Sequence, residues 1–335
     1  MKRFIIIVLF MLNGCSSPIE TVPLFIYDGN DAYIKEFERK IQSVDQSDFL
    51  IKTYVSQNSQ IIQNEQIDQA FKEKHPLLII NPVDRLSVYA IIEKAKQSNT
   101  TIIFFNREPL ASDLAAYDKA FYVGADAAQS AELQASLIMD LFGNDPKNLN
   151  QFDKNHDGII QALIFKGEQG HQDAEARTKF VIERLTVAGY QVEVLDIVIA
   201  NWDRDIAYGL MDGLLDDYRE SMELLISNND AMALGAIQRM KEKLVFEDTN
   251  KNGVIDRESE PWVPVVGIDG ITAAIDSIKS GYLYGTVKND SQNMALIIIE
   301  LAKWLLEEKS LTDFPYEITN GKYVWVNYQK MTLDE

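Results

Sequence analysis

Short apolar runs rich in β-branched residues alternate along the chain with longer segments of helical periodicity. The runs predict strands at Leu24–Tyr27, Phe49–Val55, Leu77–Ile80, Thr101–Phe105, Phe121–Val123, Gln161–Phe165, Val192–Ile197, Glu223–Ser227, Val263–Ile268 and Gly285–Val287. The segments between them predict helices, among them Leu86–Gln97, Ala127–Phe142, Ala174–Leu185, Met232–Lys243 and Asp290–Leu306. This alternation predicts an α/β protein whose parallel sheets are covered by helices on both faces. So many strands favour two doubly wound lobes over one sheet.

Length and composition agree with this interpretation. The chain has 335 residues, enough for two domains, and 46% of them are hydrophobic, as in folded proteins. The 51 acidic residues outnumber the 32 basic ones and give a net charge of -19, which excludes general binding to a nucleic acid backbone. One cysteine allows no internal disulfide, and with three histidines a Cys/His zinc site is not expected.

The beginning of the chain has the pattern of an export signal. Basic residues at 2–3 precede the apolar run Phe4–Leu12, which is too short to span a membrane. The residues 12–15 resemble a lipobox, so we expect residues 1–15 to act as a lipoprotein signal, with Cys15 retained as the lipid-modified residue and residues 16–22 as a tether. The alternative is an ordinary signal peptide with an incidental cysteine. Both interpretations place the mature protein outside the cytoplasm.

Polar side chains follow several of the predicted strands closely. They are Asp31, Asn106, Asn229, Asp269 and Asn289. In open α/β sheets, ligands bind outside the carboxyl ends of the strands. Together these residues indicate one polar ligand held from both lobes. For any one of them alone a helix N-cap is the simpler explanation, because Asp and Asn are favoured there.

A further polar cluster begins the helix near residue 172. Asp173 and Arg177 are spaced i, i+4 and share a helix face, and His171 lies just before them. These planar groups could donate and accept hydrogen bonds to a neutral polyol, and the rings of Tyr33 and Trp202 could cover the apolar faces of a sugar. The alternatives are a helix start with a surface ion pair, and two ordinary core aromatics.

Two loops have the ligand spacing of an EF-hand. The first has oxygen donors at positions one, three, five and nine, and a carbonyl at seven: Asp153, Asn155, Asp157, Gln161 and Ile159. Position twelve is Ile164, so a bidentate carboxylate has to come from elsewhere. The second loop repeats the pattern with Asp248, Asn250, Asn252, Val254 and Asp256, followed by Glu258, Ser259 and Glu260. Each loop could instead be a polar Asx turn.

Taken together, these residues resemble the periplasmic galactose/glucose-binding proteins of ABC sugar importers, which have the type I periplasmic-binding fold. The resemblance runs from Pro23 to Tyr328 and is most specific at 104–109, 167–177 and 227–232. It implies a sugar site made of Asp31, Tyr33, Asn106, His171, Asp173, Arg177, Trp202, Asn229, Asp269 and Asn289. It further implies that Asp31 accepts from the 4-hydroxyl, and that two aromatic rings sandwich the sugar. The family usually has phenylalanine where this chain has Tyr33.

The resemblance also implies a structural calcium ion in the first loop. Glu223 matches the family's completing carboxylate, so the implied ligands are Asp153, Asn155, Asp157, the Ile159 carbonyl, Gln161 and bidentate Glu223. The second loop has no counterpart in the family and lies in an insertion between Lys243 and Pro261.

The implied architecture is two lobes with three crossovers near Asp126, Asn289 and Val326. The N-terminal lobe is then 19–125 plus 290–325, and the C-terminal lobe 126–289 plus 326–335. A sugar between the lobes would close them by hinge motion. A membrane permease, and in some cases a chemoreceptor, would recognise the closed form. We expect a monomer without enzymatic activity.

Three alternative functions involve the same residues or the same fold. A glycosidase would need paired carboxylates such as Asp173 and Asp269, but Arg177 and the amides are expected to keep them ionised. A sensor that serves only a receptor or kinase would share every feature of the site. A transcriptional repressor is disfavoured by the export leader and by the lack of a basic helix-turn-helix. The sequence leaves galactose and glucose as equal candidates.

Overall fold

The computed structural model describes residues 20–45 and 47–333. The predicted export signal and Cys15 lie outside the described residues, as does the tether up to residue 19. Among the helices it does describe, none has the length and apolar content needed to cross a membrane.

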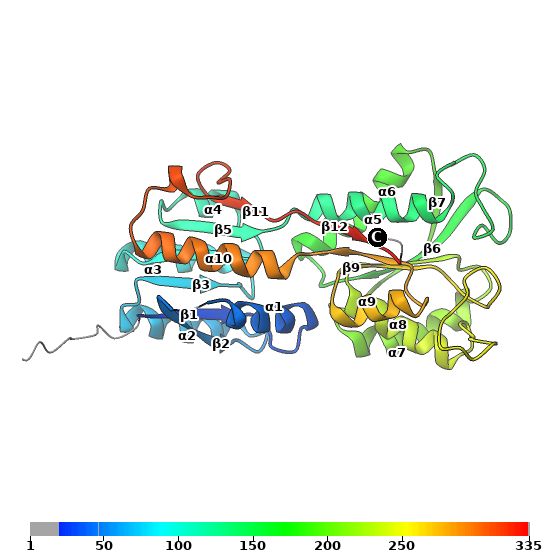
Figure 1. The fold of residues 1–335 in the computed structure, drawn as a ribbon, viewed down its shortest axis with the longest axis horizontal. Coiled ribbons are helices and arrows are strands. Elements are labelled where there is room, and N and C mark those ends of the chain that lie inside the picture. Colours follow the sequence, from blue (N-terminus) through cyan, green and yellow to red (C-terminus); the bar gives the residue numbers. More distant parts are fainter. Residues whose placement is uncertain (1–19, 46, 334–335) are drawn as a thin grey trace, which may run out of the picture.

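The first lobe is built on a six-stranded sheet in the order β11-β5-β4-β3-β1-β2 (Figure 1). The strands are β1 (Glu20–Ile26), β2 (Phe49–Val55), β3 (Leu77–Ile80), β4 (Thr101–Phe105), β5 (Ala120–Gly124) and β11 (Tyr323–Trp325). All of its neighbouring strands pair in parallel. The buried, β-branched runs seen in the sequence form these strands, because both faces of the sheet are covered.

The second lobe repeats the design with the order β12-β10-β9-β8-β6-β7. Its strands are β6 (Ile159–Lys166), β7 (Gln191–Ile199), β8 (Leu224–Ser227), β9 (Val265–Asp269), β10 (Gly285–Lys288) and β12 (Gln329–Met331). Only β12 is antiparallel, and it pairs with β10 at the edge. The predicted fold class, two doubly wound parallel-sheet lobes, is confirmed.

Helices cover both sheets. The first lobe carries α1 (Ala32–Ser43), α2 (Gln60–Glu73), α3 (Val88–Ser98), α4 (Ala111–Ala115) and α10 (Ser291–Leu306), with short 3₁₀ turns at Arg85–Ser87 and Leu311–Asp313. The second lobe carries α5 (Ala127–Leu141), α6 (Gln172–Val187), α7 (Arg204–Tyr218), α8 (Asp230–Glu242) and α9 (Thr272–Lys279). Packing is typified by α1, whose Phe37 is fully buried and stacks on Phe105 of β4 at 4.5 Å.

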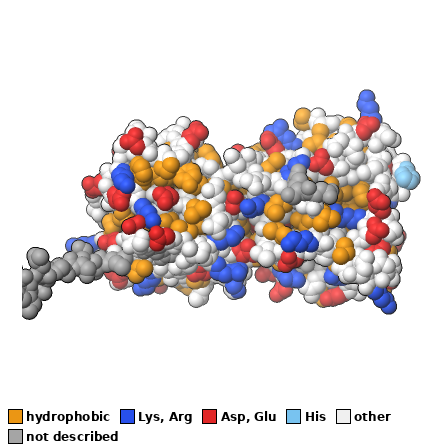
Figure 2. All heavy atoms as spheres, viewed as in Figure 1, with side chains coloured by type: hydrophobic (Ala, Val, Ile, Leu, Met, Phe, Trp, Pro, Cys, Tyr) orange, Lys and Arg blue, Asp and Glu red, His pale blue; other side chains and the backbone are white. Residues whose placement is uncertain are grey.

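The chain passes between the lobes three times, after β5, after β10 and after β11 (Figure 1). Helix α10 therefore packs against α1 of the first lobe, although it follows the whole of the second lobe in sequence. Figure 2 shows the narrow waist between the lobes, with acidic and basic side chains interspersed over this face.

Most predicted strands match the observed ones within two residues, apart from the start of β1. The strands β11 and β12 were not predicted, and β9 begins at Val265, two residues later than expected. The late start has a local cause, because the preceding Pro264 has no N–H group for a ladder. The predicted helix from Leu86 begins with a 3₁₀ turn, and α3 itself starts at Val88.

Candidate functional site

The carboxyl ends of the two sheets face each other across the waist and enclose a small cavity of about 40 Å³. Residues predicted for the site line it: Asp31, Tyr33, Asn106, His171, Asp173, Arg177, Trp202, Asn229 and Asp269. Tyr27, Ile34 and Arg107 also line it and were not predicted. The cavity adjoins a wider hollow of about 1040 Å³ that shares Tyr27, Asp31, Arg107 and Trp202. The structure therefore brings both predicted polar clusters to one place.

Asn289 is the one predicted site residue that is absent from the lining of this cavity. It is buried just after β10, its backbone N–H donates to the carbonyl of Asp269 at 3.0 Å, and its Oδ1 has no partner among the described residues. Asn289 thus lies beside Asp269 but outside the lining of the cavity.

Several cavity residues are also helix N-caps. Asp31 caps α1, because its Oδ1 accepts from the N–H of Ile34 at 2.8 Å, and its Oδ2 accepts from the Tyr27 hydroxyl at 2.6 Å. Asn229 caps α8 by accepting from the N–H of Met232 at 2.9 Å. The two explanations offered by the sequence, cap and site, are therefore compatible, since capping fixes the side chain at the cavity edge.

The two aromatic side chains are held in different ways. Tyr33 is buried, and its hydroxyl contacts the sulfur of Met294 in α10 at 3.9 Å. The extra hydroxyl of Tyr33 is therefore directed into the first lobe. Trp202 has a left-handed backbone with φ 66° and packs against Gly167, where an added Cβ would lie 2.3 Å from the indole ring. Only glycine leaves room for Trp202 there.

Charged groups dominate the second-lobe wall. Arg177 is 3% exposed and donates to the carbonyl of Asn228 at 2.7 Å, to the Tyr328 hydroxyl at 3.0 Å and to Asp173 at 3.3 Å. Asp269 lies 4.0 Å from the same guanidinium. Burial raises the pKa of Asp173 and, more strongly, that of Asp269, while Arg177 lowers both. These carboxylates were expected to stay ionised beside Arg177, and burial opposes that effect, because desolvation favours the protonated form.

His171 enters the cavity as the N-cap of α6. Its Nδ1 accepts from the N–H of Asp173 at 3.1 Å. Burial, together with Arg107 and Arg177, holds the pKa of His171 well below its usual value. The imidazole is therefore neutral at pH 7, and Nε2 carries the proton as a donor.

Side chains of the two lobes bond directly across the waist. Arg107 lies 3.7 Å above the Tyr27 ring and pairs with Glu168 of the second lobe at 3.3 Å. Gln172 donates to Glu108 at 2.7 Å, and the N–H of Thr272 donates to Glu36 at 3.0 Å. The lobes are therefore closed on each other. Arg107 follows Asn106 at the end of a predicted strand, so the rule that found Asn106 could have found it too.

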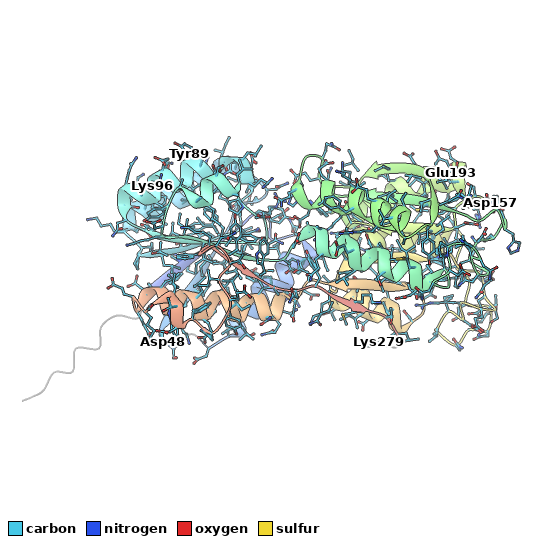
Figure 3. All side chains as sticks on the ribbon, turned by 90° about the horizontal axis from the view of Figure 1, so that it is seen from above. Asp48, Tyr89, Lys96, Asp157, Glu193 and Lys279 are labelled. Carbon is cyan, nitrogen blue, oxygen red and sulfur yellow. The ribbon has the colours of Figure 1, made fainter. Side chains whose placement is uncertain are left out.

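The first EF-hand-like loop lies at the end of the second lobe far from the waist, where Figure 3 labels Asp157. Glu223 is 1% exposed, and its carboxylate accepts from the N–H groups of Lys154 and Gln161 at 2.6 and 3.3 Å. Asp153 Oδ1 and Gln161 Oε1 are buried without a partner among the described residues. Burial raises the pKa of Glu223. This donor set suits a hard cation that takes oxygen ligands.

The second loop has the same backbone pattern around a different glutamate. Glu260 accepts from the N–H groups of Thr249 and Asn250 at 2.8 and 3.1 Å, and from that of Asp256 at 2.9 Å. The carboxylate that completes this loop is thus Glu260, one residue beyond position twelve. Within the described ranges, no three His, Cys, Asp or Glu side chains converge as a metal centre by themselves, so either loop would also need amide or backbone oxygens.

Comparison with known proteins identifies a family for this chain. The family model described as a periplasmic binding protein domain matches residues 22–310. The D-galactose/methyl-galactoside binding periplasmic protein MglB of Haemophilus influenzae is 37% identical over 295 residues, covering 87% of this chain and 82% of that protein. The multiple sugar-binding periplasmic protein SbpA of Azospirillum brasilense is 24% identical and covers 93% and 82%.

Solved structures share the fold. An ABC transporter solute-binding protein from Actinobacillus succinogenes with bound D-allose superimposes with a TM-score of 0.76 at 18% identity, covering 94% of this chain and 98% of that one. A solute-binding protein from Bacillus halodurans with bound myo-inositol gives 0.75 at 21% identity, covering 94% and 95%.

Proposed function

Because the chain belongs to the family of periplasmic binding protein domains, which act outside the cytoplasm and bind substrates, we propose that it binds a hexose between its lobes. The favoured ligands are D-galactose and D-glucose, since the relative in Haemophilus influenzae is a D-galactose-binding protein by name. The observation that carries the proposal is the cavity itself, in which planar polar groups from both lobes meet two aromatic rings.

The chemistry of this lining suits a neutral polyol. Carboxylates at Asp31, Asp173 and Asp269 accept hydrogen bonds, whereas Arg177 and His171 donate them, and a sugar hydroxyl can do both. The rings of Tyr33 and Trp202 would take the apolar faces of the pyranose. Since both hydroxyl and C–H surfaces are matched, we expect a ring sugar to be preferred over a linear polyol.

Binding would stabilise the closed arrangement of the lobes. A ligand shifts such an equilibrium only if it contacts both halves, and residues of both lobes line the cavity. The closed form would deliver the sugar to the membrane subunits of an ABC importer. A chemoreceptor or sensor kinase could read the same closed form. The protein would bind the sugar without converting it, as expected for a family of binding proteins.

We further propose that the protein is a lipoprotein anchored through Cys15. Its support is the basic and apolar pattern of residues 1–15 together with the extracytoplasmic family. The soluble lobes would then remain tethered near the membrane that holds the importer.

A structural calcium ion in the first loop is the remaining part of the proposal. Its ligands would be Asp153, Asn155, Asp157, the carbonyl of Ile159, Gln161 and Glu223. Two unpartnered buried oxygens and a desolvated carboxylate support it, because each is costly unless a cation compensates it. Calcium would pin residues 153–161 to β8, far from the sugar, and so stabilise the lobe without touching the ligand.

Calorimetric titration of protein lacking residues 1–15, after partial unfolding and refolding to release bound sugar, tests the proposal. The panel is galactose, glucose, ribose, xylose, arabinose and mannose. We expect binding of galactose or glucose, and at least tenfold weaker binding in Asp173→Ala and Asn229→Ala. Asp276→Ala is the matched control, because that carboxylate is exposed on α9. Binding of none of these sugars would contradict the proposed function.

A further inference from the structure

A network of buried amides lies behind the first-lobe wall of the cavity, and the site as described makes no use of it. Asn81 follows β3 directly and is 0% exposed. Its Oδ1 accepts from the N–H of Tyr27 at 3.4 Å, and its Nδ2 donates to the carbonyl of Phe105 at 3.2 Å and to Oδ1 of Asn106 at 3.1 Å. Asn81 therefore joins the ends of β1, β3 and β4.

Asn81 is itself held from behind by a second buried amide. Gln63 of α2 is also 0% exposed, and its Nε2 donates to the Asn81 carbonyl at 3.0 Å. The same Nε2 donates to the Ser56 hydroxyl at 3.1 Å, while its Oε1 accepts from the N–H of Val83 at 2.9 Å. An amide whose oxygen and nitrogen both have fixed partners has one orientation, and in a buried network that orientation is strongly enforced.

The network of buried amides ends at Asn106, which lines the cavity. Its backbone is left-handed, with φ 60°, and its carbonyl accepts from the Tyr122 hydroxyl at 2.9 Å. Because Asn81 occupies its Oδ1, the Nδ2 of Asn106 is left without a partner among the described residues and is free to donate. The orientation of this amide is thus set from the protein side of the wall.

We propose that Asn81 is a positioning residue that fixes Asn106 as a hydrogen-bond donor to the ligand. The first-lobe wall then offers Asp31, which follows β1, as an acceptor and Asn106, which follows β4, as a donor, with β3 and Asn81 between them. A sugar has to meet them with one hydroxyl that donates and one oxygen that accepts. This inference rests on the proposed function for the nature of the ligand, but the orientation of Asn106 does not depend on it.

The substitution Asn81→Asp is the sharpest test. It keeps the size and the acceptor for Tyr27, but places an acceptor where Asn81 donates to Asn106 and to the carbonyl of Phe105. Asn106 then has to turn its own amide to donate to the new carboxylate, so that it presents Oδ1 to the cavity. Thr100→Val is the matched control, because Thr100 is 2% exposed in the same lobe and its hydroxyl donates to the carbonyl of His75, away from the cavity.

The first readout is binding of monodeoxy forms of the preferred hexose. One of them loses affinity in the wild type but not in Asn106→Ala, and this sugar reports the Asn106 contact. In Asn81→Asp we expect the parent sugar to bind at least tenfold more weakly and the penalty of that deoxy sugar to shrink below twofold. Thr100→Val should keep the full penalty. A full penalty in Asn81→Asp would overturn the proposal.

The second readout needs no sugar. The side-chain amide signals of Asn106, assigned by their loss in Asn106→Ala, are followed by ¹⁵N–¹H NMR. We expect them to move in Asn81→Asp and to stay in place in Thr100→Val. Unmoved signals would overturn the positioning role even if sugar binds. Asn81→Ser, which shortens the side chain without adding charge, gives the same two readouts if Asn81→Asp does not fold. Failure of the wild type to bind any hexose would refute the proposed function, while the NMR result would still decide the role of Asn81.

Discussion

The two EF-hand-like loops of the second lobe share one backbone design around two different glutamates. In both, the N–H groups at loop positions two, three and nine point to a single carboxylate, Glu223 in the first loop and Glu260 in the second. In both, the glycine at position six donates to the first aspartate, at 3.0 Å in one loop and 2.7 Å in the other. The backbone pattern alone therefore does not distinguish the loops.

The loops differ in what their remaining oxygens do. In the first, position nine is Gln161, whose Oε1 is buried and unpartnered. In the second, position nine is Asp256, which accepts from the Ser259 hydroxyl at 2.6 Å and from the N–H of Glu258 at 3.1 Å. Burial raises the pKa of Glu223, whereas backbone donors, that of Asp256 foremost, lower the pKa of Glu260. In the first loop, buried oxygen atoms are left without a compensating partner. In the second loop, hydrogen-bond donors of the protein itself largely compensate the oxygens.

The largest expected effect is that of calcium on the whole protein. With free calcium at about a hundred times the dissociation constant, linkage gives about 2.7 kcal/mol, or a rise of roughly 4 °C in the Tm of a chain of this length. Differential scanning calorimetry in calcium and in chelator measures it. Equal Tm values in the two conditions would show that neither loop binds the ion.

Next in size is the substitution Glu223→Gln. We expect it to remove most of the calcium-dependent rise in Tm, because the bidentate carboxylate is lost. In chelator, Tm should stay the same or increase: a raised pKa means that the ionised carboxylate of Glu223 costs folding free energy at neutral pH, and the amide carries no charge. An equal loss of Tm in calcium and in chelator would show that Glu223 is no metal ligand.

A smaller effect is expected from Glu260→Gln. Since Glu260 accepts several backbone N–H groups whether or not an ion is present, its replacement should lower Tm by roughly 2 °C in calcium and in chelator alike. The same scans measure this, with Glu258→Gln as the control. A loss of Tm confined to calcium-containing buffer would show that the second loop binds calcium as the first loop does.

The smallest effect is expected from the substitution Ser259→Ala in the second loop. It removes the hydroxyl that donates to Oδ2 of Asp256 and leaves this oxygen available as the ligand at position nine. We expect terbium luminescence titration to show one tight site in the wild type, and a second, weaker site that tightens in Ser259→Ala. Unchanged titration curves would show that Asp256 does not limit the second loop.

The sequence predicted most of the fold because its strands are buried on both faces and read as continuous apolar runs. It missed β11 and β12, which have three residues each and pair along the edges that β5 and β10 offer. Strands this short have no periodicity of their own, so their pairing is a tertiary effect.

The position of a side chain at the cavity was predictable where a polar residue follows a strand, as for Asp31 and Asp269, or where an aromatic ring was expected to cover a sugar face, as for Trp202. Arg107 was within reach of the first rule and was overlooked. Asn81 also follows a predicted strand directly, so the first rule could have singled it out, but the sequence did not show which atoms it contacts. Its significance comes only from the atoms of Tyr27 and Asn106 that the fold brings to it.

The three passages of the chain between the lobes also dictate an order of assembly. Helix α10 covers α1 and lies beside β4 and β5, yet it is made only after residues 127–288 of the second lobe. Until it arrives, the part of α1 that packs on α10 is uncovered, whereas the second lobe lacks only its edge strand β12. During export we therefore expect the lobe that is made second to be nearly complete first, and the lobe that begins the chain to close over its core only at the end.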